Sequence, residues 1–120
     1  MEQIEVLPAS KRGKMEAQWG ALTWNASAEL GNTKELTVGQ CLLHPGQKNP
    51  PHCHPNCEEV LVVMQGTISH TIEDGKEVTL QEGDTITIPE GIPHQACNIG
   101  EGDAILFIAF SSANRETQGE

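Results

Sequence analysis

Glycine and proline residues divide this chain into short apolar segments, and this division limits the folds that the sequence can adopt. There are 12 Gly and 7 Pro in 120 residues, and no long segment repeats apolar residues with the 3.6-residue period of a helix. Short strands separated by frequent turns are typical of β-sandwiches and β-barrels. We therefore expect an all-β fold with little helix.

The positions of the expected strands follow from the apolar segments and from the turns between them. These strands are residues 18–24, 36–44, 58–64, 67–73, 76–80, 85–88, 94–99 and 104–110. Asp74 and Gly75 separate two of them and predict a tight hairpin, because both residues tolerate a positive φ. Further turns are expected at 82–84 and 100–103.

The length of the chain and its 37% of apolar residues suit one domain with a single modest core. We expect an N-terminal arm at residues 1–14, a barrel at 15–110 and a C-terminal tail at 111–120. Both end segments are polar and carry no apolar pattern, so we expect them to be extended or frayed.

The charge of the chain argues against two classes of partner. The formal net charge is −10, from 17 acidic and 7 basic side chains, and such a surface repels nucleic acid and anionic membranes. The first residues are acidic and no apolar stretch reaches the ~18 residues of a membrane span, so we expect a cytoplasmic protein. We interpret the four cysteines, Cys41, Cys53, Cys57 and Cys97, as free thiols.

One expected strand is apolar on both of its faces. Residues 60–64 read Val-Leu-Val-Val-Met, whereas a strand with one wet face alternates apolar and polar residues. One face can line the inside of a barrel, and the other needs cover from the N-terminal strand or from a second copy of the chain. We therefore expect a homodimer.

Three side chains near the middle of the chain have the spacing of metal ligands. His52 and His54 lie two residues apart in an extended segment, so their side chains share one face while Cys53 points away. Glu59 follows a short loop and shares its parity with the inward positions of the next strand. His94, from a neighbouring strand, then closes the site.

Three imidazoles and one carboxylate suit a range of divalent transition metals: Fe, Mn, Ni, Zn, Co or Cu. Four ligands leave two positions of an octahedron for water, substrate or oxygen. A structural zinc site is more often closed by four Cys or His ligands. This open set of mixed ligands therefore favours a functional metal site over a purely structural one.

Other residues compete for these roles. Glu58 is an alternative carboxylate that only strand parity separates from Glu59, and Cys57 is an alternative thiolate ligand. A soft thiolate site would give Glu59 no role as a ligand, so we favour the carboxylate. His44 and His70 have no partner at ligand spacing, and we interpret both as structural or solvent-facing. Trp19 and Trp24 are interpreted as packing residues.

The four candidate ligands belong to two longer motifs. The first is Gly-x5-His-x-His-x4-Glu-x6-Gly, and the second is Gly-x5-Pro-x-Gly-x2-His-x3-Asn. The residues that match are Gly46, His52, His54, Glu59 and Gly66 in the first motif, and Gly83, Pro89, Gly91, His94 and Asn98 in the second. These motifs resemble those of the cupin superfamily, and by that resemblance the spacing before Gly66 selects Glu59 over Glu58.

The resemblance implies a fold and a metal site. It implies an antiparallel β-barrel of the jelly-roll or double-stranded β-helix type, commonly dimeric, with one metal ion. It also implies that His52, His54, Glu59 and His94 are the metal ligands.

The residues that contact a substrate are harder to identify from the sequence. The chain has no Tyr, so the general-base candidates near the motifs are Gln40, His44, Lys48, Gln95 and a metal-bound water. Arg115 is the only arginine after the last expected strand and is a candidate for binding a carboxylate. We take Gln40, Lys48 and Arg115 as the candidate substrate-binding residues.

The segment around Arg115 is similar to one in small cupins that linearise unsaturated uronates. In those proteins the last strand ends in Phe-Ser and is followed shortly by Arg, whereas residues 110–115 carry one extra residue before Arg115. That offset favours a surface arginine here.

Three hypotheses of function follow. The first is a metal-dependent isomerase or lyase acting on a small polar or sugar-derived metabolite, including a uronate. The second is an iron-dependent dioxygenase, and the third is a non-catalytic module that binds a small molecule. A metal with two open positions serves the first two equally well.

Overall fold

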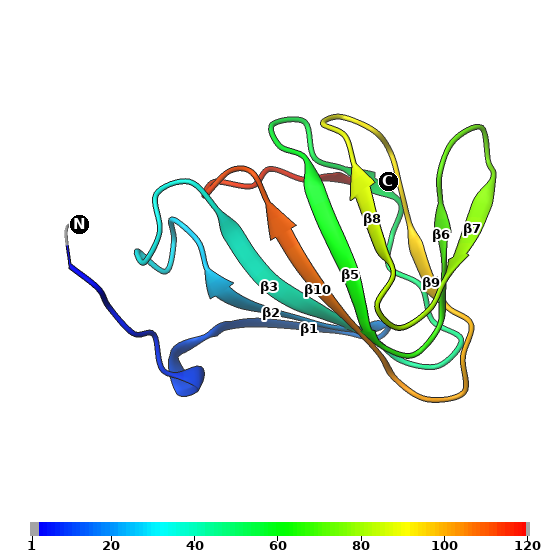
Figure 1. The fold of residues 1–120 in the computed structure, drawn as a ribbon, viewed down its shortest axis with the longest axis horizontal. Helices are drawn as coiled ribbons and strands as arrows, with labels where there is room; N and C mark the ends of the chain where they lie inside the picture. The colour runs from blue at the N-terminus through cyan, green and yellow to red at the C-terminus, as the bar shows by residue number, and fades with distance from the viewer. Residues whose placement is uncertain (1–2, 120) are drawn as a thin grey trace.

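Two antiparallel β-sheets face one another in the computed structural model, which describes residues 3–119 (Figure 1). The larger sheet has the order β1-β2-β3-β10-β5-β8, the smaller has β7-β6-β9, and a two-stranded ribbon pairs β11 with β4. The strands are β1 (Gly13–Ala17), β2 (Gly20–Ala26), β3 (Thr37–Leu43), β4 (His52–Cys53), β5 (Glu59–Gln65), β6 (Ile68–Thr71), β7 (Glu77–Leu80), β8 (Thr85–Ile88), β9 (Ala96–Asn98), β10 (Ala104–Phe110) and β11 (Gln118–Gly119). The one helix among these residues is a short 3-10 turn, η1 (Ala9–Lys11), so the expected all-β fold is confirmed.

The smaller sheet and the ribbon act as one layer. Isolated bridges pair Lys48 with Cys97 and His52 with His94, and these bridges attach the segment around β4 to the edge of β9. The hydrogen-bonded sheets do not close into one continuous barrel. Two facing layers with this connectivity form a jelly roll, which agrees with the expected fold class.

The core lies between the two layers and follows strand parity. In β5 the side chains of Glu59, Leu61 and Val63 are buried, while those of Val60 and Val62 are partly exposed. Alternate residues of β3 and β10 are buried in the same way. Because neighbouring side chains of a strand point to opposite faces, this alternation places Glu59 among apolar core residues.

The predicted hairpin at Asp74 and Gly75 is confirmed. Both residues have positive φ, 51° and 75°, and Lys76 N donates to Glu73 O across the turn. This geometry matches the right-handed twist of the two strands that it joins, β6 and β7.

The N-terminal part of the expected arm leaves the body of the protein, but its last residues join the larger sheet. Ile4 and Val6 are exposed on a segment that leaves the body of the protein (Figure 1). Gly13 and Lys14, placed in the arm by the sequence, begin β1 and pair with Trp24 and Thr23 of β2. Residues 1 and 2 lie outside the described part.

The C-terminal segment is packed rather than frayed, and we call residues 114–119 the C-terminal strap. Asn56 Nδ2 donates to Asn114 O at 2.8 Å, and Glu116 N donates to Asn56 Oδ1 at 3.0 Å. Beyond these contacts, Gln118 and Gly119 pair with Cys53 and His52 as β11. Of the two expected states, extended or frayed, the strap is extended and held in place, because β4 offers it a free strand edge; residue 120 lies outside the described part.

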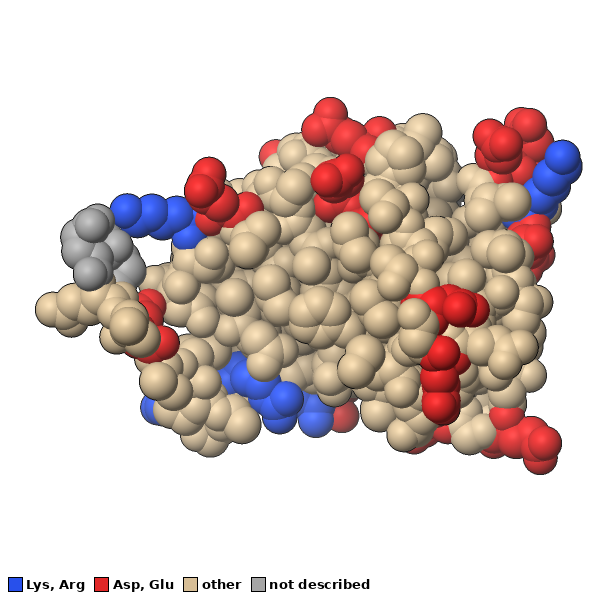
Figure 2. Space-filling model, in the orientation of Figure 1, with Lys and Arg blue, Asp and Glu red and all other residues tan. Residues whose placement is uncertain are grey.

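The outer face of the larger sheet is apolar and partly open. Met64 is 60% exposed and Phe107 is 41% exposed, and Phe107 lies opposite Val62 in the pairing of β10 with β5. Figure 2 shows that the centre of this view, over β3, β10 and β5, is uncharged, while charged side chains lie along the edges and acidic ones also lie to the right of the centre. Nothing within residues 3–119 covers this face completely.

Candidate metal centre

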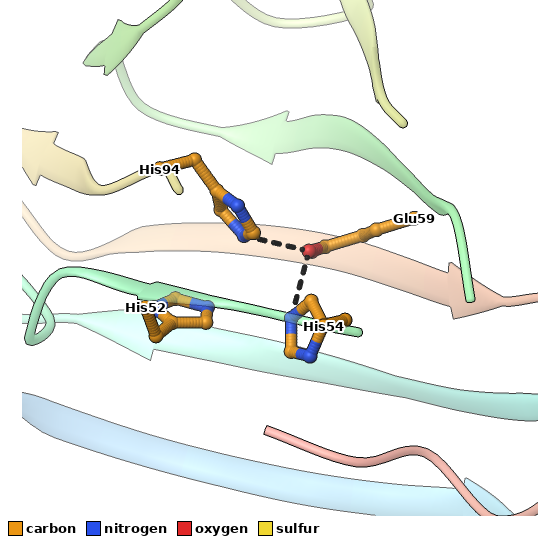
Figure 3. Close-up of side chains that lie close together, drawn as sticks. All are labelled: His52, His54, Glu59 and His94. Carbon is orange, nitrogen blue, oxygen red and sulfur yellow. Dashed lines mark hydrogen bonds and ion pairs between the residues drawn. The ribbon is translucent and has the colours of Figure 1, made fainter. Parts of the chain in front are cut away.

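Four side chains converge at one point between the layers (Figure 3). His52 comes from β4, His54 from the residue after it, and Glu59 from the start of β5, while His94 faces His52 across an isolated bridge. One ligand atom from each of the four residues lies within 4.8 Å of the other three. The structure therefore brings together the four residues that the motifs predict.

Glu59 is the centre of this cluster. Its Oε1 atom is 3.1 Å from His94 Nε2 and 3.3 Å from His54 Nε2. The ring of His52 completes the group, with its centroid 4.3 Å from that of His94. Glu59 is 5% exposed and His54 is 3% exposed, so both are shielded from water.

Each imidazole is held through its Nδ1 atom by a backbone carbonyl. The pairs are His52 with Pro50 O at 2.7 Å, His54 with Glu116 O at 3.0 Å, and His94 with Ile92 O at 2.9 Å. A carbonyl oxygen only accepts, so each Nδ1 carries the proton. The Nε2 atoms, which face the cluster, are then the atoms with a lone pair available for a metal.

The buried polar atoms of this cluster fit a cation. His54 Nε2 is buried and makes no hydrogen bond within residues 3–119. Its lone pair faces the Glu59 carboxylate, which is itself an acceptor, so two acceptors oppose each other across 3.3 Å. A divalent transition metal among the four ligand atoms satisfies all of them, and three imidazoles with one carboxylate are suitable donors for it.

The protonation states favour a metal at neutral pH. Burial raises the pKa of Glu59, but its contacts with His54 and His94 outweigh this effect and lower the pKa to about 2. Burial lowers the pKa of His52 to about 4. Both groups are therefore deprotonated near pH 7, as metal ligands must be.

Two opposing effects act on the pKa of His94. Burial lowers its pKa, but hydrogen bonds to Glu59 and Ile92 and the charge of Glu59 outweigh burial and raise it. The contact with Glu59 thus favours a proton on His94 more than burial alone allows. A metal ion competes with that proton for the same lone pair.

A cavity of about 290 Å³ opens beside the four ligands. Its wall is mainly apolar, and it includes Met15, Trp19, Leu22, Trp24, Leu106, Ile108 and Phe110. The polar residues of the wall are Asn49, His70, Arg115 and Thr117, in addition to the four ligands. Trp19 and Trp24, interpreted from sequence as packing residues, thus also form part of a binding site.

Arg115 lies in the cavity wall and is not a free surface residue. Its guanidinium carbon is 4.5 Å from the ring centre of Trp24 and 5.2 Å from that of Phe110. Its Nη1 donates to Thr117 Oγ1, which lies 3.2 Å from His54 Nδ1. The strap carries both residues, so it connects the arginine to a metal ligand.

The other two candidate substrate residues are elsewhere. Gln40 is half-buried on β3, with the parity opposite to the cavity residue Cys41, and Lys48 is exposed beside Cys97. Neither lines the cavity. Strand parity explains the position of Gln40, because alternate residues of β3 face the core and Gln40 lies between them.

The competing ligands are not part of the cluster. Glu58 is exposed one residue before Glu59, and Cys57 is buried outside the four-ligand group. All four cysteines are free, as expected. His44 is exposed and lies 3.2 Å from Asp103, which agrees with a solvent-facing role.

His70 is a cavity residue that sequence reasoning missed. It is 1% exposed, donates through Nδ1 to Thr71 O, and stacks on His94 with ring centres 5.6 Å apart. It also lines the cavity. Its parity with Ile68, an apolar residue of the same strand, was the available signal, because both side chains face inward from β6.

The remaining motif residues build the frame around the site. Asn98 Nδ2 donates to Leu43 O and Gly102 O, and Asn98 Oδ1 accepts from Gly100 N, so this buried amide holds three chain segments together. Gly91 has a φ of 77° and donates its N–H to His54 O. A positive φ favours glycine at this turn, which ties the second motif to the first.

Comparison with known proteins agrees with the motifs. Residues 39–110 match the family model described as the cupin domain. Among curated relatives, oxalate oxidase 1 of Hordeum vulgare is 31% identical over 90 residues, which cover 69% of this chain and 45% of the relative. The chain thus spans less than half the length of the curated relatives that it matches.

Solved structures show the same fold. Recombinant oxalate oxidase in complex with glycolate has a TM-score of 0.78 at 26% identity, with 96% of this chain and 59% of that chain covered. An uncharacterised protein of Klebsiella pneumoniae with a double-stranded β-helix domain also has a TM-score of 0.78, at 19% identity, and covers 98% of this chain and 99% of its own. With its motifs, its two-layer fold and the matched family model, this chain belongs to the cupin family.

Proposed function

We propose that this cupin is a metal-dependent enzyme that acts on a small metabolite carrying a carboxylate. The observation that carries the proposal is the buried Nε2 of His54, which lacks a hydrogen bond within the described residues and faces the Glu59 carboxylate. A buried acceptor left in this state costs about 1–3 kcal/mol unless a partner arrives, and a metal ion is the partner that suits the whole cluster.

Each residue has a defined task in this proposal. His52, His54, Glu59 and His94 hold the ion, and the backbone carbonyls behind the three histidines keep their rings in place. A bound divalent metal supplies a Lewis acid with open positions for the oxygen atoms of a substrate. Arg115 provides a fixed cation for a carboxylate, and the apolar walls exclude water around it.

Metal analysis tests the first part of the proposal. The protein, purified without a chelating tag, is expected to contain close to one Fe, Mn, Ni, Zn, Co or Cu ion per chain by mass spectrometry. His54→Ala is expected to lose that ion, while His44→Ala, which changes an exposed histidine outside the cluster, retains it. Equal metal content in the two variants contradicts the proposal.

A screen of acids then separates the possible reactions. Isomerase or lyase chemistry on a sugar acid such as an unsaturated uronate proceeds without oxygen, whereas oxidase or dioxygenase chemistry consumes it. The curated relatives named oxalate oxidase favour testing oxalate and glycolate with an oxygen electrode. A protein that binds acids with the metal absent, and turns none of them over, is instead a binding module.

We also propose that a second copy of the chain covers the outer face of the larger sheet. The uncharged centre of this face and the exposure of Met64 and Phe107 support a homodimer (Figure 2). Light scattering at micromolar concentration is expected to give twice the chain mass, and Phe107→Glu is expected to give the monomer mass with the metal content unchanged. A wild-type monomer contradicts this assignment.

The cellular location stays a prediction, and a cytoplasmic protein is expected. Within residues 3–119, no helix has the length and apolar character needed to cross a membrane.

A further inference from the structure

We propose that the ligand of the cavity is a 2-oxo or 2-hydroxy carboxylic acid with an apolar body, such as an aryl-substituted one, rather than a small dicarboxylate. This inference deepens the proposed function and rests on a metal bound at the four-ligand cluster. Three properties of the cavity support it: its charge, its walls and its size.

The charge of the cavity selects an acid. Among the described wall residues, the groups charged at neutral pH apart from the histidines are Glu59 and Arg115, which cancel. A divalent ion therefore leaves the cavity positive, and an anionic head is attracted to it and reduces that charge. The 2-oxo or 2-hydroxy oxygen beside a carboxylate gives that head two adjacent donors for the two open metal positions.

Arg115 is placed to meet the same acidic head. Its guanidinium and the ring of His54 both pack against Phe110, at 5.2 Å and 4.9 Å between the respective centres. The stack on Trp24 and the bond to Thr117 fix its orientation, so little conformational entropy is lost when it binds a carboxylate. Burial lowers the pKa of Arg115, while the charge of Glu59 opposes that effect, and the group stays cationic at neutral pH.

The walls select the rest of the ligand. Trp19, Leu22, Leu106 and Ile108 present hydrocarbon or aromatic surface to the cavity. A dicarboxylate such as oxalate has no apolar surface to place against these residues and leaves them in contact with water. An aromatic or branched aliphatic body removes that water, and the gain scales with the apolar area buried.

The volume of the cavity agrees with such a body. Liquid water occupies about 30 Å³ per molecule, so 290 Å³ corresponds to roughly ten waters. A ligand of about ten to twelve non-hydrogen atoms fills this space. Oxalate, with six, leaves much of it unfilled.

Calorimetry with the metal-loaded, full-length protein tests the inference. The probes are phenylpyruvate, pyruvate, oxalate and 3-phenylpropionate, which lacks the 2-oxo group. Phenylpyruvate is expected to bind at least tenfold more tightly than each of the other three. Oxalate or pyruvate binding as tightly as phenylpyruvate overturns the role of the walls, and equal binding of 3-phenylpropionate overturns the role of the adjacent oxygen.

Variants of wall residues test whether the cavity wall sets the ligand preference. Leu22→Gln is expected to lower the preference for phenylpyruvate over oxalate at least fivefold, and Ile99→Gln, at an exposed site outside the cavity, is expected to leave it unchanged. Met15→Gln is a second probe, at a wall residue that is 44% exposed. An unchanged preference in both wall variants overturns the inference.

Metal analysis of each calorimetry sample distinguishes failure of this inference from failure of the proposed function. A protein that holds one metal per chain but prefers oxalate contradicts the ligand class and leaves the proposed function standing. A protein that holds no metal contradicts both.

Discussion

The strap offers a sharp test of how distant residues support the metal centre. Glu116 O accepts the proton of His54 Nδ1 at 3.0 Å, and this bond aims Nε2 at the cluster. No side-chain substitution removes a backbone acceptor, so the informative change is a chain that ends at Arg115. Loss of a partner of this kind lowers metal affinity by roughly 10- to 100-fold, or about 1.4–2.7 kcal/mol.

A chain that ends at Gln118 is the matched control. It keeps the carbonyl of Glu116 and the hydroxyl of Thr117, and it also has a shortened end that disturbs the pairing of β11 with β4. Affinity is measured by competition with a chelating dye, and the thermal unfolding of both metal-free chains checks that the fold is retained. Equal metal affinity of the two truncated chains, with both folded, refutes the supporting role of the Glu116 carbonyl.

Three further predictions concern the ligands and the thiols. Glu59→Gln is expected to abolish stoichiometric metal binding and Glu58→Gln to preserve it, as measured by metal content, because Glu58 is exposed outside the cluster. Burial lowers the pKa of His52 from 6.5 to about 4, so the unfolded chain binds more protons between these values. The melting temperature of the metal-free protein is therefore expected to fall as the pH drops from 6.5 to 4, with a smaller fall in His52→Gln; an equal fall contradicts this. Burial also raises the pKa of the Cys41 thiol to about 12, whereas Cys97 is partly exposed. After brief alkylation of the native protein, mass spectrometry is expected to find Cys97 modified before Cys41. The reverse order contradicts the burial of Cys41.

Local sequence patterns were sufficient for most strands of the core and for the four residues of the cluster, but β1, β4 and β11 were not predicted, and the strand expected at 18–24 begins in a turn. Alternation along β5 predicts that Glu59 faces the core, and the buried Glu59 beside the exposed Glu58 bears this out. The Asp74-Gly75 turn was predictable for the same reason, because a turn of this type depends on the φ preferences of its own residues. Interactions of this kind extend over only a few residues.

The cavity around the ligands was not predictable in this way. Gln40 and Lys48 lie near the motifs in sequence and yet do not reach the cavity, whereas His70 and Arg115 line it. Which side chains meet there depends on how β2, β6 and the strap pack, and no short pattern records that packing. The sequence identified the ligands but left their surroundings open.

The sequence by itself determined a β-rich cupin and the four residues that cluster between its layers, because strand parity and turn geometry are local properties. Only the tertiary structure decided that the strap lies against that cluster. His54 and Glu116 are separated by 62 residues, and their contact exists because β4 leaves a strand edge on which the strap can pair. A hydrogen bond between such distant segments depends on the whole packed fold, and therefore no spacing in the sequence signals it.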